Sequence, residues 1–301
     1  MEIINVVPHG FCQGVIRAIQ TAVSNAKENP GKKITMLGMI VHNSYVVEQC
    51  RALGIGFVEN PKKTRAELLD EIDEGIVIFT AHGISDEVRK KAEAKGLEIV
   101  DASCKDVIRT HSLVREHVKK GDVLYIGKKN HPESEGTVSL SERIHLITEE
   151  KDLDELDGLE NVLITCQTTL SLNDTKKIID ACIRKSPDAE VSPEICSATR
   201  MRQEAVMKLK DTDCLIVVGD PRSNNSNQLQ RIAYDAGIRE AYLIGSVLEL
   251  TEDMIRNKNR IAVTSGSSTP NSLTSQVTDF LKQDAETGQF ILPKEAEVRL
   301  L

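Results

Sequence analysis

Short apolar runs alternate along the chain with longer segments in which apolar residues recur every three or four positions. The short runs are strand-sized and include Ile34 to Gly38, Ile76 to Thr80, Val123 to Gly127 and Leu215 to Gly219. Two of the longer segments show helical spacing, in Val15, Ile19 and Ala22 and in Val107, His111 and Val114. This alternation predicts an α/β fold in which helices cover both faces of parallel sheets.

A threefold repeat underlies this alternation. A cysteine stands at a predicted strand-to-helix junction at Cys12, Cys104 and Cys196, and the spacing is even, because 104 − 12 and 196 − 104 both equal 92. Each cysteine is followed by an apolar strand that ends in glycine, a polar cluster, a helix and a further strand. The polar clusters are His42-Asn43-Ser44, His131-Pro132-Glu133 and Ser223-Asn224-Asn225, and the further strands lead to His82, Thr168 and Ser268. A period this long indicates a repeated domain rather than a solenoid.

We expect three small parallel-sheet α/β domains at residues 1–96, 97–190 and 191–282, and a polar C-terminal tail at 283–301 that packs on the surface. In parallel sheets, ligands bind beyond the carboxyl ends of the strands, where all the polar clusters lie. Three such domains in a pseudo-threefold arrangement would direct these ends toward one central cavity. The repeat therefore predicts a single site to which all three domains and all three cysteines contribute.

Composition narrows the function classes. The 301 residues are 40% hydrophobic and 28% charged, as in soluble globular proteins. Aromatic residues make up 3%, Trp is absent and the net charge is −8, so a nucleic-acid partner is not expected. The N-terminus lacks the features of a secretory signal, and the apolar runs are too short to span a membrane. We expect a cytoplasmic monomer without a membrane partner.

We expect the seven cysteines to be buried or to bind a metal rather than to form a disulfide framework, because their number is odd and no CxxC pair occurs. Burial as a small apolar residue suits Cys50, Cys182 and Cys214. Cys166 adjoins Gln167 near the expected cavity, but a single cysteine is a weak signal of a functional site.

Cys12, Cys104 and Cys196 fit burial poorly, because helix starts favour thiolates, and thiolates bind iron clusters and zinc. Three protein thiolates leave one metal position open, which is typical of a catalytic site. Residue chemistry alone leaves several readings open: an iron–sulfur enzyme, a three-cysteine zinc hydrolase, an iron–sulfur sensor or carrier, and an anion-binding module. The recurring His, Glu, Thr and Ser side chains favour an enzyme, and an anion-binding module leaves the cysteines unexplained.

The polar clusters suggest proton transfer and anion binding. Glu133 is a candidate proton carrier if a secluded pocket raises its pKa. Donors suited to phosphate oxygens are His42, His82, Ser223, Asn225 and Ser268. The alternative role for the segment from Ser223 is plain helix capping, which can coexist with phosphate binding. We assign His111, His117 and His145 to packing or solvent.

An ordered set of motifs identifies a family. The chain resembles the 4-hydroxy-3-methylbut-2-enyl diphosphate reductases, which act last in the methylerythritol phosphate route to isoprenoids. The matching segments run in family order from residue 10 to 270: Gly10 to Ile19, Val41-His42-Asn43, Ala81-His82-Gly83, Asp101 to Cys104, His131 to Gly136, Gln167 to Leu170, Ile195 to Gln203, Ser223 to Asn227 and Ser265 to Pro270.

The resemblance implies three α/β domains around a central [4Fe–4S] cluster on Cys12, Cys104 and Cys196. It implies that two electrons and two protons remove the substrate hydroxyl as water, giving isopentenyl and dimethylallyl diphosphates. The electrons would come from an external donor such as ferredoxin or flavodoxin. The resemblance implies that Glu133 relays protons with help from Thr168 and His131.

The resemblance also implies a diphosphate clamp, made of His42, His82, His131, Thr168, Ser223, Asn225 and Ser268. One residue departs from the family pattern, which often has two adjacent serines where this chain has Ser223-Asn224. Asparagine can also donate to phosphate, although its longer side chain changes the reach. Asn224 therefore joins the expected substrate-binding residues in place of the second serine.

Overall fold

The computed structural model describes residues 1–300, which contain three four-stranded sheets in which every strand pair is parallel. The first sheet has the order β3 (Gly56–Val58), β2 (Ile34–Leu37), β4 (Ile76–Phe79) and β5 (Glu98–Asp101). The second has the order β7 (Ile144–Ile147), β6 (Val123–Ile126), β8 (Leu163–Cys166) and β9 (Glu190–Val191). The third has the order β11 (Glu240–Ile244), β10 (Cys214–Val218), β12 (Arg260–Ser265) and β1 (Glu2–Asn5).

Helices connect these strands. They are α1 (Gln13–Glu28), α2 (Ser44–Ala52), α3 (Arg65–Leu69), α4 (Asp86–Ala94), α5 (Lys105–His117), α6 (Pro132–Val138), α7 (Leu172–Lys185), α8 (Ser197–Met207), α9 (Asn224–Asp235), α10 (Glu252–Ile255) and α11 (Asn271–Thr287), with short 3₁₀ helices at Glu150–Leu153 and Val247–Glu249. No helix within residues 1–300 is long and apolar enough to cross a membrane. The prediction of three similar parallel α/β sheets is confirmed, while their threefold arrangement around a cluster stays a prediction.

The strand that leads to each cysteine belongs to a different sheet from the one expected. β5 precedes Cys104 but completes the first sheet, and β9 precedes Cys196 but completes the second. β1 precedes Cys12 and pairs with β12, near the other end of the chain. Domains that start at residues 1, 97 and 191, as expected from the sequence, would therefore place strands that pair with each other in different domains. The reason is that each of these strands hydrogen-bonds to the strand before it, and β1, which has none before it, closes the last sheet.

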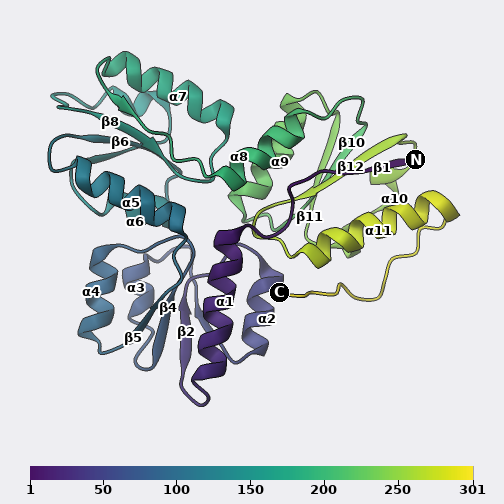
Figure 1. The fold of residues 1–301 in the computed structure, drawn as a ribbon, viewed down its shortest axis with the longest axis horizontal. Helices are drawn as coiled ribbons and strands as arrows, with labels where there is room; N and C mark the ends of the chain where they lie inside the picture. The colour runs from purple at the N-terminus through teal and green to yellow at the C-terminus, as the bar shows by residue number, and fades with distance from the viewer. Residues whose placement is uncertain (301) are drawn as a thin grey trace. The chain divides into compact units, whose positions relative to one another are not determined.

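Alternation along the strands places apolar side chains on both faces of each sheet. In β10, Cys214, Ile216 and Val218 pack toward α11, whereas Leu215 and Val217 pack toward α8 and α9. Figure 1 shows α11 along one side of this sheet. The second sheet is covered in the same way, with α7 on one face and α5 on the other. These buried faces leave only the strand ends available for ligands.

The described chain divides into two compact units. The terminal unit contains Met1–Ile16, Val41–Gln49 and the chain from Ser197 onward, and it includes the third sheet. The central unit contains Arg17–Ile40 and Cys50–Cys196, and it includes the first and second sheets.

The C-terminal tail packs on α11. This helix continues to Thr287, so the boundary expected at residue 283 falls inside it. Beyond the helix, the Gln276 side chain exchanges two hydrogen bonds with the main chain of Glu297, and the Phe290 ring meets the edge of Phe280 at 5.1 Å. Part of the segment 288–300 thus packs on α11, and residue 301 lies outside the described chain.

Candidate functional site

The three cysteines occupy equivalent positions in their sheets. Each follows an edge strand (β1, β5 or β9) and immediately precedes a helix (α1, α5 or α8). In every case the cysteine N–H donates to a carbonyl in the loop that follows the neighbouring central strand. The pairs are Cys12 with Ser267 at 3.1 Å, Cys104 with Ala81 at 3.0 Å and Cys196 with Thr168 at 3.1 Å. The repeat seen in the sequence is therefore also a repeat of hydrogen bonds, and it ties each cysteine to a predicted polar loop.

Solvent exposure separates these three cysteines from the other four. Cys12, Cys104 and Cys196 are free thiols of intermediate exposure. The remaining ones are fully buried in apolar cores, and burial raises their thiol pKa to about 11 or 12: Cys50, Cys166, Cys182 and Cys214. The expectation of burial is confirmed for Cys50, Cys182 and Cys214. Cys166 is likewise a core residue at the end of β8.

The cysteines are divided between the two units, with Cys12 in the terminal unit and Cys104 and Cys196 in the central unit. Within each unit, residues 1–300 contain no ready-made group of three or more His, Cys, Asp or Glu side chains that could hold a metal ion.

In the central unit, Thr168 binds both oxygens of the Glu133 carboxyl. Its N–H donates to Oε1 at 2.7 Å, and its hydroxyl donates to Oε2 at 3.0 Å. Both side chains are buried, with 2% of Glu133 and 4% of Thr168 exposed. The N–H can only donate, so a proton on Glu133 belongs on Oε2, and the hydroxyl then accepts instead of donating. The pair can thus pass a proton by reversing one hydrogen bond.

Burial raises the pKa of Glu133 to about 7, although the two hydrogen bonds from Thr168 oppose the shift. A carboxyl with this pKa is protonated in a large fraction of molecules near neutral pH. It can therefore act as a general acid where an ordinary glutamate would be ionised.

His82 and His131 follow strands of two different sheets in the same unit, β4 and β6. His131 caps α6, and its Nδ1 accepts the N–H of Glu133 at 3.2 Å. A neutral His131 therefore carries its proton on Nε2 and can donate from there. The His82 ring meets the His131 ring edge-on, with the centroids 5.8 Å apart. The structure thus brings His82, His131, Glu133 and Thr168 together from the first and second sheets.

In the terminal unit, three predicted anion-binding residues are linked by Ser268. Its hydroxyl lies 3.1 Å from the His42 carbonyl and 3.3 Å from the Ser223 hydroxyl. Ser223 also caps α9, where its side chain accepts the N–H of Ser226. The capping role is therefore confirmed, and it places the start of α9 beside this cluster, where a helix N-terminus favours anions.

The two asparagines of the motif occupy the first positions of α9, and both are buried. The Asn225 oxygen accepts the N–H of Ser267 at 3.0 Å, and its amide nitrogen lies 3.3 Å from the Thr199 hydroxyl. Asn225 thereby joins α9 to the loop after β12, in which the Ser267 carbonyl accepts the N–H of Cys12. Asn224 lies beside it at the helix start, as the motif predicts.

Asp220 is a site residue that the sequence motifs did not reveal. It lies one residue after the glycine that ends the β10 run, and only 5% of it is exposed. It accepts the Ser44 N–H at 2.9 Å, the Ser44 hydroxyl, and three N–H groups of Arg222. Burial alone would raise the pKa of Asp220, but these hydrogen bonds hold it well below its usual range. The signal in the sequence that could have revealed Asp220 was its position, since it is a carboxylate directly after the end of an apolar strand.

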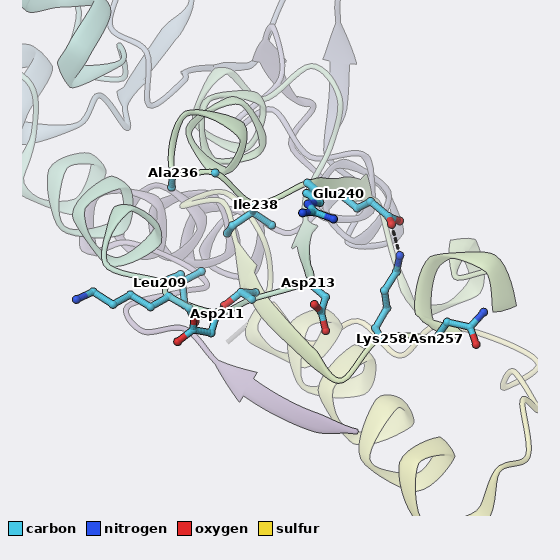
Figure 2. A pocket seen from close by; sticks show the side chains of 12 residues that line it. Leu209, Asp211, Asp213, Ala236, Ile238, Glu240, Asn257 and Lys258 are labelled. Carbon is cyan, nitrogen blue, oxygen red and sulfur yellow. Dashed lines mark hydrogen bonds and ion pairs between the residues drawn. The ribbon is translucent and has the colours of Figure 1, made fainter.

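A separate groove lies at the other ends of the third-sheet strands. It has a volume of about 840 Å³ and is lined by residues at the starts of β10, β11 and β12. Figure 2 shows Lys258 and Glu240 pointing toward each other, and Asp213 accepts the main-chain N–H groups of Asn259 and Arg260. These polar groups hold the strand starts together. The groove therefore does not belong to the candidate site at the carboxyl ends.

Comparisons with known proteins identify the family of this chain. The chain is 44% identical over 305 residues to a 4-hydroxy-3-methylbut-2-enyl diphosphate reductase of Brevibacillus brevis, covering 100% of this chain and 97% of that protein. It is 45% identical over 289 residues to the protein of that name from Symbiobacterium thermophilum, covering 94% and 97%. The solved E-1-hydroxy-2-methyl-but-2-enyl-4-diphosphate reductase from Plasmodium falciparum superposes with a TM-score of 0.87 at 30% identity, covering 99% of this chain and 95% of that one.

The sequence also matches the family described as LytB protein over residues 3–282. This range includes the three sheets except for Glu2, the three cysteines of intermediate exposure and every predicted site residue. With full-length relatives above 40% identity, the match is not limited to a shared fold. The chain therefore belongs to the LytB family of 4-hydroxy-3-methylbut-2-enyl diphosphate reductases.

Proposed function

We propose that this protein reduces 4-hydroxy-3-methylbut-2-enyl diphosphate to isopentenyl and dimethylallyl diphosphates. The observation that carries the proposal is the pairing of a buried, protonatable Glu133 with Thr168, whose carbonyl in turn accepts the N–H of Cys196. A proton donor is thereby joined to a candidate metal ligand. Membership of the LytB family supports the same reaction.

We infer that Cys12, Cys104 and Cys196 hold a [4Fe–4S] cluster. The donor set fits, because these three thiols are partly exposed at helix starts, where the helix dipole favours a thiolate. Three soft sulfur ligands suit an iron–sulfur cluster and leave one iron without a protein ligand. When bound, the cluster would supply electrons and a Lewis-acidic iron.

The reaction balances with groups of known kind. The C–O bond of the allylic alcohol breaks, the oxygen leaves as water, and a carbon of the allyl group gains a hydrogen. Two protons and two electrons are consumed in total. Glu133 would hold the proton for the leaving oxygen, and His131 and Thr168 would assist its transfer. The electrons would come from a small external carrier such as ferredoxin or flavodoxin.

The diphosphate would be bound by donors at the strand ends. Ser223, Ser268 and Asn225 lie around the start of α9, and the backbone of His42 is held in the same cluster. His82 and His131 would add N–H donors from the central unit. Hydroxyl, amide and imidazole donors together with a helix N-terminus are suited to phosphate oxygens. We propose that Asn224 contributes at the same helix start, and that the protein works as a cytoplasmic monomer.

The first experiment is anaerobic purification followed by iron and sulfide analysis and an absorption spectrum, repeated with the hydroxymethylbutenyl diphosphate. We expect a brown protein with about four irons per chain and a spectrum that changes with the substrate. Cys104→Ala should lose the iron, whereas Cys182→Ala serves as the matched control because that thiol is buried in a core. A colourless protein that holds zinc would instead favour the hydrolase.

A further inference from the structure

Arg202 connects two segments that carry proposed cluster ligands. It lies on α8, only 4% of it is exposed, and its two terminal nitrogens donate to different main-chain carbonyls. Nη2 donates to Gly10 at 2.7 Å, and Nη1 donates to Ala198 at 2.9 Å. Gly10 precedes Cys12 by two residues, and Ala198 follows Cys196 by two residues. One buried guanidinium on α8 therefore joins the first turn of this helix, which follows Cys196, to the main chain before Cys12.

Gly10 is held from two further directions. Its N–H donates to the Ser265 hydroxyl at 2.7 Å, at the end of β12. Its φ is +72°, and a Cβ at this position would lie 1.5 Å from Oδ1 of Asn271, the first residue of α11. A side chain there would be strained by the positive φ and would displace the Asn271 amide, so α8, β12 and α11 together determine the path of the chain into Cys12.

The positive charge of Arg202 is buried and therefore needs compensation. Burying a cation is unfavourable unless negative charge or aligned dipoles compensate for it. The carbonyl oxygens of Gly10 and Ala198 provide part of this compensation, and thiolates with a bound iron–sulfur cluster would add to it. The field of Arg202 extends to the segment before Cys12, where burial and this charge together lower the pKa of His9.

We propose that Arg202 is a positioning residue for the cluster, which clamps the main chain next to Cys12 and Cys196 and whose positive charge favours the reduced state. This role rests on the proposed function and deepens it. Groups that orient metal ligands change metal affinity by about 10–100-fold and also tune the redox potential. A mostly polar buried face of α8 is consistent with this role, because a helix face that only packs on a core is usually apolar. The face consists of Thr199, Arg202, Gln203 and Val206.

The test compares Arg202→Gln and Arg202→Lys with Arg200→Gln, an exposed arginine on the same helix. Three quantities are measured: loss of iron to a chelator, the midpoint potential of the cluster, and amide hydrogen exchange around Gly10 in the iron-free protein. Arg202→Gln should bind iron about 10–100-fold more weakly and show a lower potential. Exchange around Gly10 should be roughly tenfold faster, because a hydrogen bond from a charged donor is lost. Arg200→Gln should match the wild type.

Arg202→Lys separates charge from geometry. A lysine keeps the charge but lacks the planar guanidinium that spans two carbonyls. Relative to Arg202→Gln, Arg202→Lys should therefore restore the midpoint potential of the cluster more fully than it restores the retention of iron. It also covers the case in which Arg202→Gln does not fold. Wild-type values for either Arg202 variant in all three measurements would overturn the positioning role, while normal reduction of substrate by the wild type would leave the proposed function standing. A wild-type protein without any iron–sulfur cluster would overturn both.

Discussion

Thr168 contacts Glu133 twice, through its N–H at 2.7 Å and through its hydroxyl at 3.0 Å, and its carbonyl accepts the N–H of Cys196. One residue thus contacts the candidate proton donor and a candidate cluster ligand. Its N–H pins one carboxyl oxygen, so the exchangeable proton resides on the other.

Replacing Glu133 by Gln should remove the proton donor with little change in shape. We expect turnover to fall by about 10²–10⁴-fold while the iron content stays that of the wild type. Glu135→Gln is the matched control, since that carboxylate is exposed on the same helix. Turnover is measured anaerobically with a chemical reductant. Near-normal activity of Glu133→Gln would eliminate this carboxyl as the proton route.

Removing the Thr168 hydroxyl should move the pH profile. Activity should fall as pH rises through about 7, because Glu133 loses its proton in that range. The hydroxyl lowers this pKa, so Thr168→Val should raise it and shift the alkaline limb to higher pH. Thr168→Ser keeps the hydroxyl and should keep the wild-type profile. An identical limb in Thr168→Val and the wild type would contradict the assignment.

Glu133 should also make stability depend on pH. Its pKa rises from 4.5 in the unfolded chain to about 7 in the folded protein, so the folded state holds the proton more tightly. The contribution is fully present below pH 4.5 and is lost as pH rises through 7, by roughly 3 kcal/mol in all. Urea unfolding of the wild type and Glu133→Gln between pH 4.5 and 8 isolates it. Parallel stability curves would show that the raised pKa is wrong.

Asp220→Asn should weaken substrate binding more than catalysis. Asp220 anchors Ser44, two residues after His42, and is itself three residues before Ser223, so it sets the loops of two proposed diphosphate ligands. Losing the charge weakens its hydrogen bonds, and we expect KM to rise about tenfold with a smaller change in kcat. Asp235→Asn, at the exposed end of α9, is the control. A drop in kcat alone would argue against a positioning role.

Asn224 tests the departure from the family's serine pair. If its amide donates to phosphate, Asn224→Ala should raise KM about tenfold, and Asn224→Ser should recover part of the loss. The measurement is steady-state kinetics at saturating reductant, with tryptic mapping to verify folding. An unchanged KM in Asn224→Ala and Asn224→Ser would remove a direct phosphate role for this side chain.

Much of the fold could be predicted because it depends on local patterns. The strands from Ile34 and Val123 occur within a residue or two of their expected bounds, since apolar periodicity and turn residues act over short distances. The spacing of the cysteines also revealed the repeat before any contact was known. By contrast, β1 pairs with β12, some 250 residues away along the chain, and no local pattern specifies that partner.

The sequence by itself determined the family, the alternation of strands and helices, and the candidate chemistry, because residue type and order carry that information. Only the tertiary structure decided the electrostatics. It buries Glu133 so that its pKa rises to about 7, and it directs five hydrogen bonds onto Asp220, which lowers the pKa of that carboxyl. It also places Arg202 against Gly10, 192 positions apart in the chain. Charge, burial and long-range contacts depend on what surrounds a side chain in space, and that environment exists only after folding.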